Sequence, residues 1–114
     1  MTVSEIAAAL DARALTMPDP DREVTGGYCG DLLSWVMGRA QSGDLWMTIM
    51  SNVNTIAVAS LSDVSAVLLA EGVTLDPELI KTAEEKDVNV LSTDLPAYEA
   101  AVRLGELLNR QRAE

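Results

Sequence analysis

The sequence contains no histidine, and this absence removes several catalytic designs at once. Serine and cysteine nucleophiles are commonly activated by a histidine base, and histidine is also the most common metal ligand. The sequence also lacks the Gly-x-x-x-x-Gly-Lys-Ser/Thr loop that holds nucleotide phosphates in many kinases and ATPases. The chain therefore carries no arrangement typical of a hydrolase of these types or of a kinase.

Phenylalanine is also absent, and aromatic residues make up only 4% of the 114 residues. Because 48% of the residues are nonetheless hydrophobic, the core must consist mainly of Ala, Val, Leu, Ile and Met. A chain of this length is expected to form one domain that buries about two-thirds of its unfolded surface. We expect this domain to cover residues 1–108 and residues 109–114 to form a frayed tail.

Cysteine and long apolar runs are scarce as well. Cys29 is the only cysteine, so no disulfide can form within the chain. No apolar run approaches the ~20 residues of a membrane span. The first residues also lack the basic segment of a secretory signal. These features favour a cytoplasmic protein.

Basic residues are few, and the 8 lysines and arginines stand against 18 acidic residues, for a net charge of -10. Such a surface repels nucleic acid and anionic membranes, so neither is expected as a partner. Small anionic ligands are compatible with it, because backbone N–H groups at a helix N-terminus can hold a phosphate whatever the net charge.

Alternating helix and strand patterns predict an α/β fold. Two continuous apolar runs, residues 45–50 and 66–70, are typical of strands that are covered on both faces. Residues 54–61 between them predict a short buried helix, and such a unit favours a parallel pair of strands. The predicted architecture is a mostly parallel sheet flanked by helices, preceded by a small N-terminal helix and strand. The remaining expected strands are residues 12–16, 23–29 and 88–91, and the remaining expected helices are residues 6–10, 32–39, 77–86 and 95–108.

Helix starts are marked by capping residues. Thr2 and Glu5 have the spacing of a capping box, which predicts the first helix. Asp31, Asp76 and Asp94 precede apolar stripes and are expected to be N-caps.

A glycine pair, Gly26 and Gly27, stands in the expected strand 23–29 and leads through Gly30 into a helix. Glycines weaken a strand, so a close approach or a bend must account for them. One interpretation is open backbone that accepts an anion or an adenine-type ligand. The other is a bulge or a tight strand crossing at a subunit contact.

Two further polar loops follow expected buried strands, at residues 51–55 and 92–94. Open α/β sheets bind ligands at the carboxyl ends of their strands, so we expect these loops and the glycine pair to converge on one rim. The alternative is that each polar residue merely caps a helix. The candidate ligand-binding residues are Thr25, Gly26, Gly27, Asn52, Asn54, Thr55, Ser92, Thr93 and Asp94.

Cys29 and the two tryptophans are the remaining residues of note. A lone cysteine in an apolar strand usually behaves as a small buried hydrophobe, although a reactive thiol is the alternative. Trp35 and Trp46 either close the core or anchor a partner surface.

Several segments together resemble the DRTGG domain family. The letters of that name appear as the spaced pattern Asp21-Arg22 and Thr25-Gly26-Gly27, because Glu23 and Val24 separate the two parts. The segments 43–46, 54–59 and 91–94 are also similar to later family segments, so the resemblance covers nearly the whole chain. It implies a relationship to the N-terminal domain of HPr kinase/phosphorylase, whose kinase chemistry resides in a separate domain. It also implies a regulatory role and dimer contacts, as in certain nucleotide-regulated pyrophosphatases that contain CBS domains.

Three functional hypotheses follow. The first is a non-catalytic, homodimeric regulatory module that binds a small ligand such as an adenine nucleotide and needs no cofactor. The second is a structural interaction protein that docks onto a larger enzyme or assembly factor. The third and weakest is an enzyme in which Asp21, Asp31 and Asp94 gather around a divalent cation.

Overall fold

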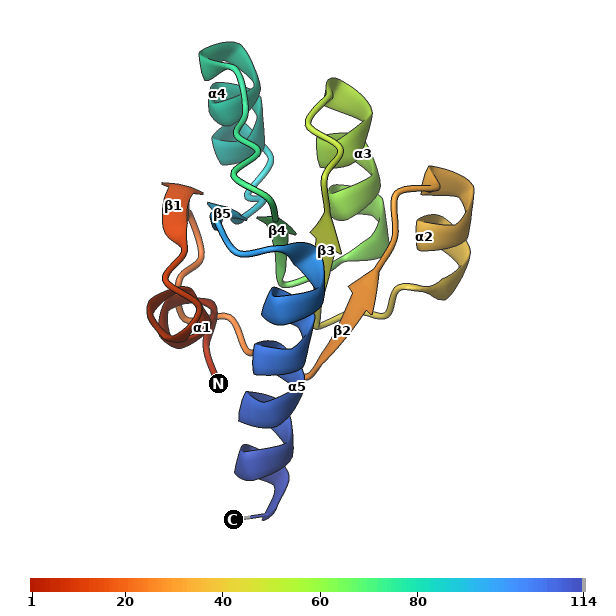
Figure 1. Cartoon of the computed structure of the whole chain (residues 1–114). Coiled ribbons are helices and arrows are strands. Elements are labelled where there is room, and N and C mark those ends of the chain that lie inside the picture. Colours follow the sequence, from red (N-terminus) through yellow and green to blue (C-terminus); the bar gives the residue numbers. More distant parts are fainter. Residues whose placement is uncertain (114) are drawn as a thin grey trace.

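The computed structural model describes residues 1–113, which form a single five-stranded sheet with helices on both faces (Figure 1). The strand order is β1-β5-β4-β3-β2. Strands β2 to β5 pair in parallel, and β1 pairs with β5 in the antiparallel direction. The expected α/β class with a mostly parallel sheet is confirmed. The strands are β1 (Arg13–Thr16), β2 (Gly26–Cys29), β3 (Asp44–Thr48), β4 (Ala66–Leu69) and β5 (Val90–Ser92).

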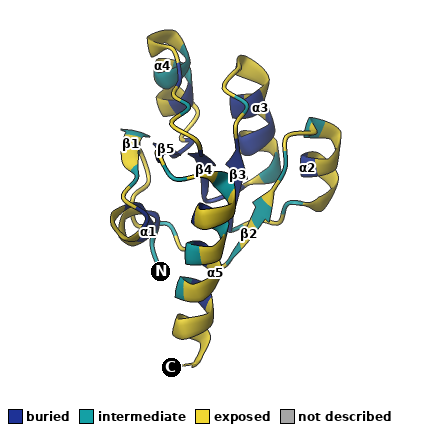
Figure 2. Ribbon diagram, in the orientation of Figure 1, coloured by how far each residue is buried: buried dark blue, intermediate teal, exposed yellow. Residues whose placement is uncertain are grey.

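The helices form two layers that enclose the sheet. Side chains of α1 and α5 pack on one face, against Leu45, Leu68 and Leu91. Side chains of α2, α3 and α4 pack on the other face, against Trp46 and Val67. Figure 2 shows the buried strands between helices whose outer surfaces are exposed. The helices are α1 (Val3–Ala9), α2 (Leu33–Arg39), α3 (Val53–Ser62), α4 (Pro77–Glu85) and α5 (Ala97–Ala113).

The two central strands explain the continuous apolar runs of the sequence. Every residue of β3 and β4 is buried. Successive side chains of a strand point to opposite faces, so a strand that is covered by helices on both sides must be apolar throughout. The edge strand β2 alternates instead between partly buried and exposed residues.

The first helix begins as its capping box predicts. The Thr2 hydroxyl accepts a hydrogen bond from the Glu5 backbone N–H, and the Glu5 carboxylate accepts one from the Thr2 N–H. Both bonds satisfy donors that the first turn of a helix leaves free. The bond that the Glu5 carboxylate accepts from the Thr2 N–H also lowers the pKa of that carboxyl.

None of the three aspartates that were expected to cap helices makes a side-chain capping bond. Asp76 lies at the N-cap of α4 without such a bond, and Asp31 and Asp94 bind elsewhere. Asp31 lies before α2, but its carboxylate accepts hydrogen bonds from the Thr48 hydroxyl at 2.6 Å and the Ile49 N–H at 3.0 Å. Asp94 pairs with Arg13 at 3.3 Å, and the N–H of Ala97 at the start of α5 donates to a Glu71 carboxylate oxygen instead. These two carboxylates therefore join separate elements of the sheet.

The last helix does not end at Leu108. It continues to Ala113, and Glu114 lies outside the described residues. The guanidinium of Arg112 donates to the Thr25 carbonyl oxygen at 2.9 Å, and the side chain of Gln111 accepts a hydrogen bond from the Met1 amino group. These contacts hold the final turns of α5 against the amino end of β2.

Candidate ligand site at the edge strand

The nine candidate residues do not converge on one rim. Gly26 pairs with Asp44 at the start of β3, whereas Asn52 follows the end of that strand. Because β2 and β3 run in parallel, the glycine pair lies near the amino ends of the strands. The loops at 51–55 and 92–94 follow the carboxyl ends, so the sheet separates the two groups.

The loop after β3 serves as a helix cap. The side-chain oxygen of Asn52 accepts hydrogen bonds from the N–H groups of Asn54 and Thr55. The Thr55 side chain is buried and donates to the Met50 carbonyl. Asn54 itself is exposed. Local hydrogen bonding thus accounts for the polar residues at this position.

The polar side chains of the loop after β5 also form hydrogen bonds within the chain. The Ser92 hydroxyl donates to the Val73 carbonyl at 2.6 Å, and the Thr93 hydroxyl donates to the Leu10 carbonyl at 3.2 Å. Both residues are completely buried. Their hydroxyl groups satisfy backbone oxygens that would otherwise be unpaired in the interior.

The chain itself uses the space beside the two glycines, which the sequence analysis assigned to another molecule or subunit. A Cβ atom on Gly26 would lie 2.7 Å from an Asp44 carboxylate oxygen, and one on Gly27 would lie 2.9 Å from a Leu104 methyl group. Gly26 therefore makes room for a carboxylate of β3, and Gly27 allows α5 to approach the strand.

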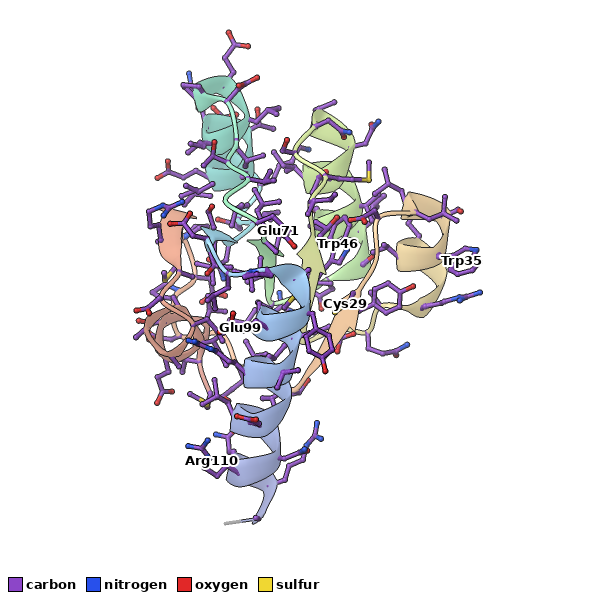
Figure 3. All side chains as sticks on the ribbon, in the orientation of Figure 1. Cys29, Trp35, Trp46, Glu71, Glu99 and Arg110 are labelled. Atoms are coloured by element: carbon purple, nitrogen blue, oxygen red, sulfur yellow. The ribbon has the colours of Figure 1, made fainter. Side chains whose placement is uncertain are left out.

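Open space lies next to this region, on both sides of β2. A cavity of about 260 Å³ is lined by residues of β2 and α5, and one of about 250 Å³ lies at the carboxyl ends of β2 and β3. A third, of about 460 Å³, lies between β2 and α2. Cys29 borders all three, and Figure 3 shows it between α5 and the outer helix that carries Trp35.

The cavity between β2 and α5 has an apolar wall and a polar end. Ala101, Leu104 and Leu108 of α5 form the wall, and Asn109 and Arg112 lie at the end. Arg112 is anchored there by its hydrogen bond to Thr25. An apolar wall beside a guanidinium suits a ligand with an apolar ring and an anionic group.

Cys29 is exposed at the edge of the sheet, contrary to the interpretation as a buried hydrophobe. Partial desolvation of the thiol and the nearby Asp31 carboxylate both raise its pKa. A raised pKa keeps the thiol protonated at neutral pH, and the protonated form is a poor nucleophile. The environment of Cys29 therefore favours an unreactive thiol.

The two tryptophans have different roles. Trp46 is fully buried in β3, and its indole N–H donates to the Gly30 carbonyl at 2.9 Å. Trp35 projects from α2 with 52% of its surface exposed, and the guanidinium of Arg39 lies 3.8 Å from the centre of its ring. Met37 is also exposed on this helix, and Leu32 is exposed at the N-cap that precedes it. We call Leu32 and Trp35 the α2 patch; Met37 follows Trp35 by two residues and therefore lies on another side of the helix.

The carboxylates Asp21, Asp31 and Asp94 do not gather around a cation position. Within residues 1–113, no group of three His, Cys, Asp or Glu side chains is arranged to hold a metal ion. In the same range, none of the helices combines the length and the apolar character that a membrane crossing requires.

Sequence reasoning missed the residues of α5 that line the cavity. Gly105, Asn109 and Arg112 lie one helical turn apart, and two of them fall in the segment that was expected to fray. The spacing Tyr98, Val102, Gly105, Asn109, Arg112 follows the i, i+4, i+7 rule for a single helix face. This spacing indicates from the sequence alone that these residues share one face of the helix.

Substitution of Gly43, just before β3, tests how closely the backbone packs at the amino end of the sheet. We expect Gly43→Ala to lower the free energy of unfolding by about 1–3 kcal/mol, because its φ of 90° suits only glycine. A Cβ atom there would also lie 2.5 Å from the Thr25 hydroxyl oxygen. Urea denaturation measures the change.

The matched control is Gly38→Ala in the last turn of α2, where a Cβ atom meets no atom within 4 Å. Alanine there is expected to stabilise the protein by about 0.5–1 kcal/mol, because glycine has a poor helix propensity. Equal destabilisation by both substitutions would contradict the interpretation of Gly43.

The chain belongs to the DRTGG domain family, which matches residues 5–107. It is similar in structure to the CBS and DRTGG domains of the regulatory region of Clostridium perfringens pyrophosphatase, determined in complex with the activator diadenosine tetraphosphate. The TM-score is 0.72 at 16% sequence identity, and the match covers 90% of this chain and 45% of that one. The chain thus spans less than half the length of this structural neighbour. A search of curated proteins found no match.

Proposed function

We propose that this protein is a non-catalytic, homodimeric regulatory module that binds a small anionic ligand, such as an adenine nucleotide, between β2 and α5. The observation that carries the proposal is the cavity that leads from an apolar wall to Arg112 and Asn109. Family membership and the nucleotide activator of the similar pyrophosphatase region support it. We further propose a cytoplasmic location, and neither nucleic acid nor a membrane is among the proposed partners.

The volume of the cavity limits the size of the ligand that it can hold. Sites for drug-sized molecules span about 300–1,000 Å³, and this one has about 260 Å³. It therefore suits a nucleobase or a nucleoside, with the phosphates near Arg112 at the open end. A whole dinucleotide does not fit inside it.

The proposed site keeps only part of the set expected from the sequence. Thr25, Gly26 and Gly27 lie beside the cavity or the Arg112 guanidinium. The other candidates, Asn52, Asn54, Thr55, Ser92, Thr93 and Asp94, lie in loops after the carboxyl ends of the strands. A ligand held between β2 and α5 at Arg112 does not reach them, and they are not part of the proposed site.

The test is calorimetric titration with ATP, ADP, AMP, diadenosine tetraphosphate and GTP. For a nucleotide that binds, we expect Arg112→Ala to weaken the affinity by about 10- to 100-fold, because a hydrogen bond to a charged group contributes about 1.5–3 kcal/mol. The matched control is Arg110→Ala on the same helix. Arg110 is exposed and points away from β2 in Figure 3, so its removal should leave the affinity unchanged.

Two outcomes count against ligand binding at this site. Absence of heat with every nucleotide at millimolar concentration would remove the proposed ligand. Equal loss of affinity in the Arg112 and Arg110 variants would show that general charge, and not the cavity, attracts the nucleotide.

The α2 patch favours a second candidate function, docking onto a larger protein. Leu32 and Trp35 are both exposed and lie three residues apart at the start of α2, so they are neighbours on the surface. Trp46 is not part of such a surface, because it is completely buried. Trp35 is therefore the tryptophan that this alternative depends on.

A further inference from the structure

The cavity between β2 and α2 brings aromatic and charged side chains together. It has a volume of about 460 Å³, and its walls include Tyr28, Asp31, Leu32, Trp35 and Arg39. The chain has only two tryptophans, two tyrosines and no phenylalanine, so one of each aromatic type lines this cavity. Tryptophan, tyrosine and arginine are also the residues that most often dominate the binding energy of contacts between proteins.

The two aromatic side chains form opposite sides of the cavity. Tyr28 is half-buried and packs against the core on the α2 side of the sheet, and a Cβ atom on Gly30 would lie 3.1 Å from its ring. Tyr28 is therefore a fixed wall. Trp35 is 52% exposed and extends from the outer helix in Figure 3, and Leu32 beside it is 56% exposed. Apolar surface thus borders the space between β2 and α2.

Arg39 brings an unpaired positive charge to this space. Its guanidinium lies 3.8 Å from the centre of the Trp35 ring. A guanidinium on a ring face keeps N–H donors at its rim, where a carboxylate can bind. None of the ion pairs within residues 1–113 includes Arg39, although acidic residues outnumber basic ones by 18 to 8.

Asp31 brings a negative charge to the same cavity. Its Oδ1 atom accepts hydrogen bonds from the Thr48 hydroxyl and the Ile49 N–H, and both donors are neutral. No cation is paired with this exposed carboxylate within residues 1–113. Asp31 precedes α2 and Arg39 is the last residue of that helix, so the helix carries opposite charges at its two ends.

We propose that this cavity docks a segment of another protein in which a bulky apolar residue lies between a basic and an acidic residue. The apolar side chain packs between Tyr28 and Trp35. The acidic side chain binds Arg39, and the basic side chain binds Asp31. This inference rests on the second candidate function, docking through the α2 patch, and names the chemistry of the partner.

The exposure of the walls favours a protein segment as the occupant. Sites for small molecules bury about 70–90% of their ligand. Here Trp35, Leu32, Asp31 and Arg39 are all exposed, so the cavity is open along α2. Such a surface can receive one side chain of a polypeptide that continues past it on both sides. The net charge of -10 also attracts the basic residue of the segment.

The test is an NMR titration of the ¹⁵N-labelled protein with two acetylated and amidated peptides, Ser-Lys-Phe-Glu-Ser and Ser-Glu-Phe-Lys-Ser, which cover both chain directions. We expect at least one of them to shift the Trp35 indole N–H and the backbone N–H signals of β2 and α2. Trp35→Ala should weaken the affinity about 30-fold or more, as for other central aromatic contacts. The matched control is Tyr98→Ala, which removes an 82% exposed aromatic side chain from α5 and should leave the affinity unchanged.

A double-mutant cycle tests the pairing of charges. Replacing Glu by Gln in the peptide should weaken binding to the wild type about three- to tenfold and should not weaken binding to Arg39→Gln. Replacing Lys by Gln in the peptide should give the same pattern with Asp31→Asn, whose side-chain oxygen can still accept from Thr48 and Ile49. Arg103→Gln is the control, because Arg103 already pairs with Glu99 on α5.

Four results would overturn the proposal. The first is an absence of shifts with both peptides at millimolar concentration, and the second is shifts centred on Leu104 and Arg112 instead of Trp35. The third is equal affinity of the charged and the glutamine peptides for the wild type. The fourth is a dimer that dissociates on Arg39→Gln in analytical ultracentrifugation, which would assign the cavity to a second copy of the chain.

The nucleotide titration separates this inference from ligand binding between β2 and α5. A protein that binds a nucleotide through Arg112 but neither peptide loses only the docking segment proposed here. A protein that binds a peptide but no nucleotide loses only the proposed nucleotide site.

Discussion

Replacing Trp46 with alanine is expected to lower the free energy of unfolding by about 3–5 kcal/mol, the usual cost of deleting a large buried side chain. The ring has no exposed surface and packs in the cluster that includes Val36 and Ile56. The substitution also leaves the Gly30 carbonyl without its indole donor. Small domains are stable by only about 5–15 kcal/mol, so this loss is large. Urea denaturation followed by circular dichroism measures it.

Trp35→Ala is the matched control for this prediction. Half of the Trp35 surface is already in solvent, and its main partner is the Arg39 guanidinium. An exposed cation–π contact contributes about 0.5–1 kcal/mol, so the total loss should stay near about 1 kcal/mol. Comparable losses for the two tryptophans would contradict the assignment of Trp46 to the core.

The second large effect is expected at Asn89, which links the loop before β2 to the centre of the sheet. Its side-chain oxygen accepts from the Asp19 N–H at 3.0 Å, and its side-chain nitrogen donates to the carbonyls of Asp19 and Ser65 at 2.8 and 2.9 Å. The residue is 2% exposed. Asn89→Ala should lower the free energy of unfolding by about 2–4 kcal/mol, because several buried polar groups lose their partners.

Asn54→Ala provides the comparison for Asn89. The Asn54 side chain is exposed at the start of α3, and its backbone N–H keeps its bond to Asn52 after the substitution. The change in unfolding free energy should stay within about 0.5 kcal/mol. An Asn89 variant as stable as the Asn54 variant would show that water replaces the buried hydrogen bonds.

The order of secondary structure could be predicted from the sequence because its signals are local. Continuous apolar runs identify strands covered on both faces, as in β3 and β4, and the capping box at Thr2 identifies the first helix. Each signal depends on residues that are close in sequence. The fold class follows from them without knowledge of which strands are neighbours.

The arrangement of the candidate site could not be predicted in the same way. Whether Gly26 and Asn52 meet depends on where each lies along parallel strands, and only the register shows that they lie toward opposite ends. Hydrogen bonds between distant segments decide the roles of Asp31 and Asp94, which bind Thr48 and Arg13. A local capping rule assigns both aspartates to the helices that follow them.

The same limit applies to the aromatic and C-terminal residues. Trp35 and Trp46 are equally apolar in sequence, but one lies on a helix at the edge and the other on a central strand. The polar residues at 109–112 suggest a frayed end until the amino end of β2 and the Met1 amino group are placed beside them.

The pairing of β1 with β5 has a consequence for the order in which the protein is assembled. Arg13 pairs with Ser92, so β1 has no partner strand until β5 has been synthesised. Contacts between such distant segments form slowly, because a long loop must close first. β1 therefore joins the sheet late, after β2, β3 and β4 have had time to pair. During synthesis, the apolar side chains of α1 can pack against Leu45 and Leu68 before they meet Leu91 of β5.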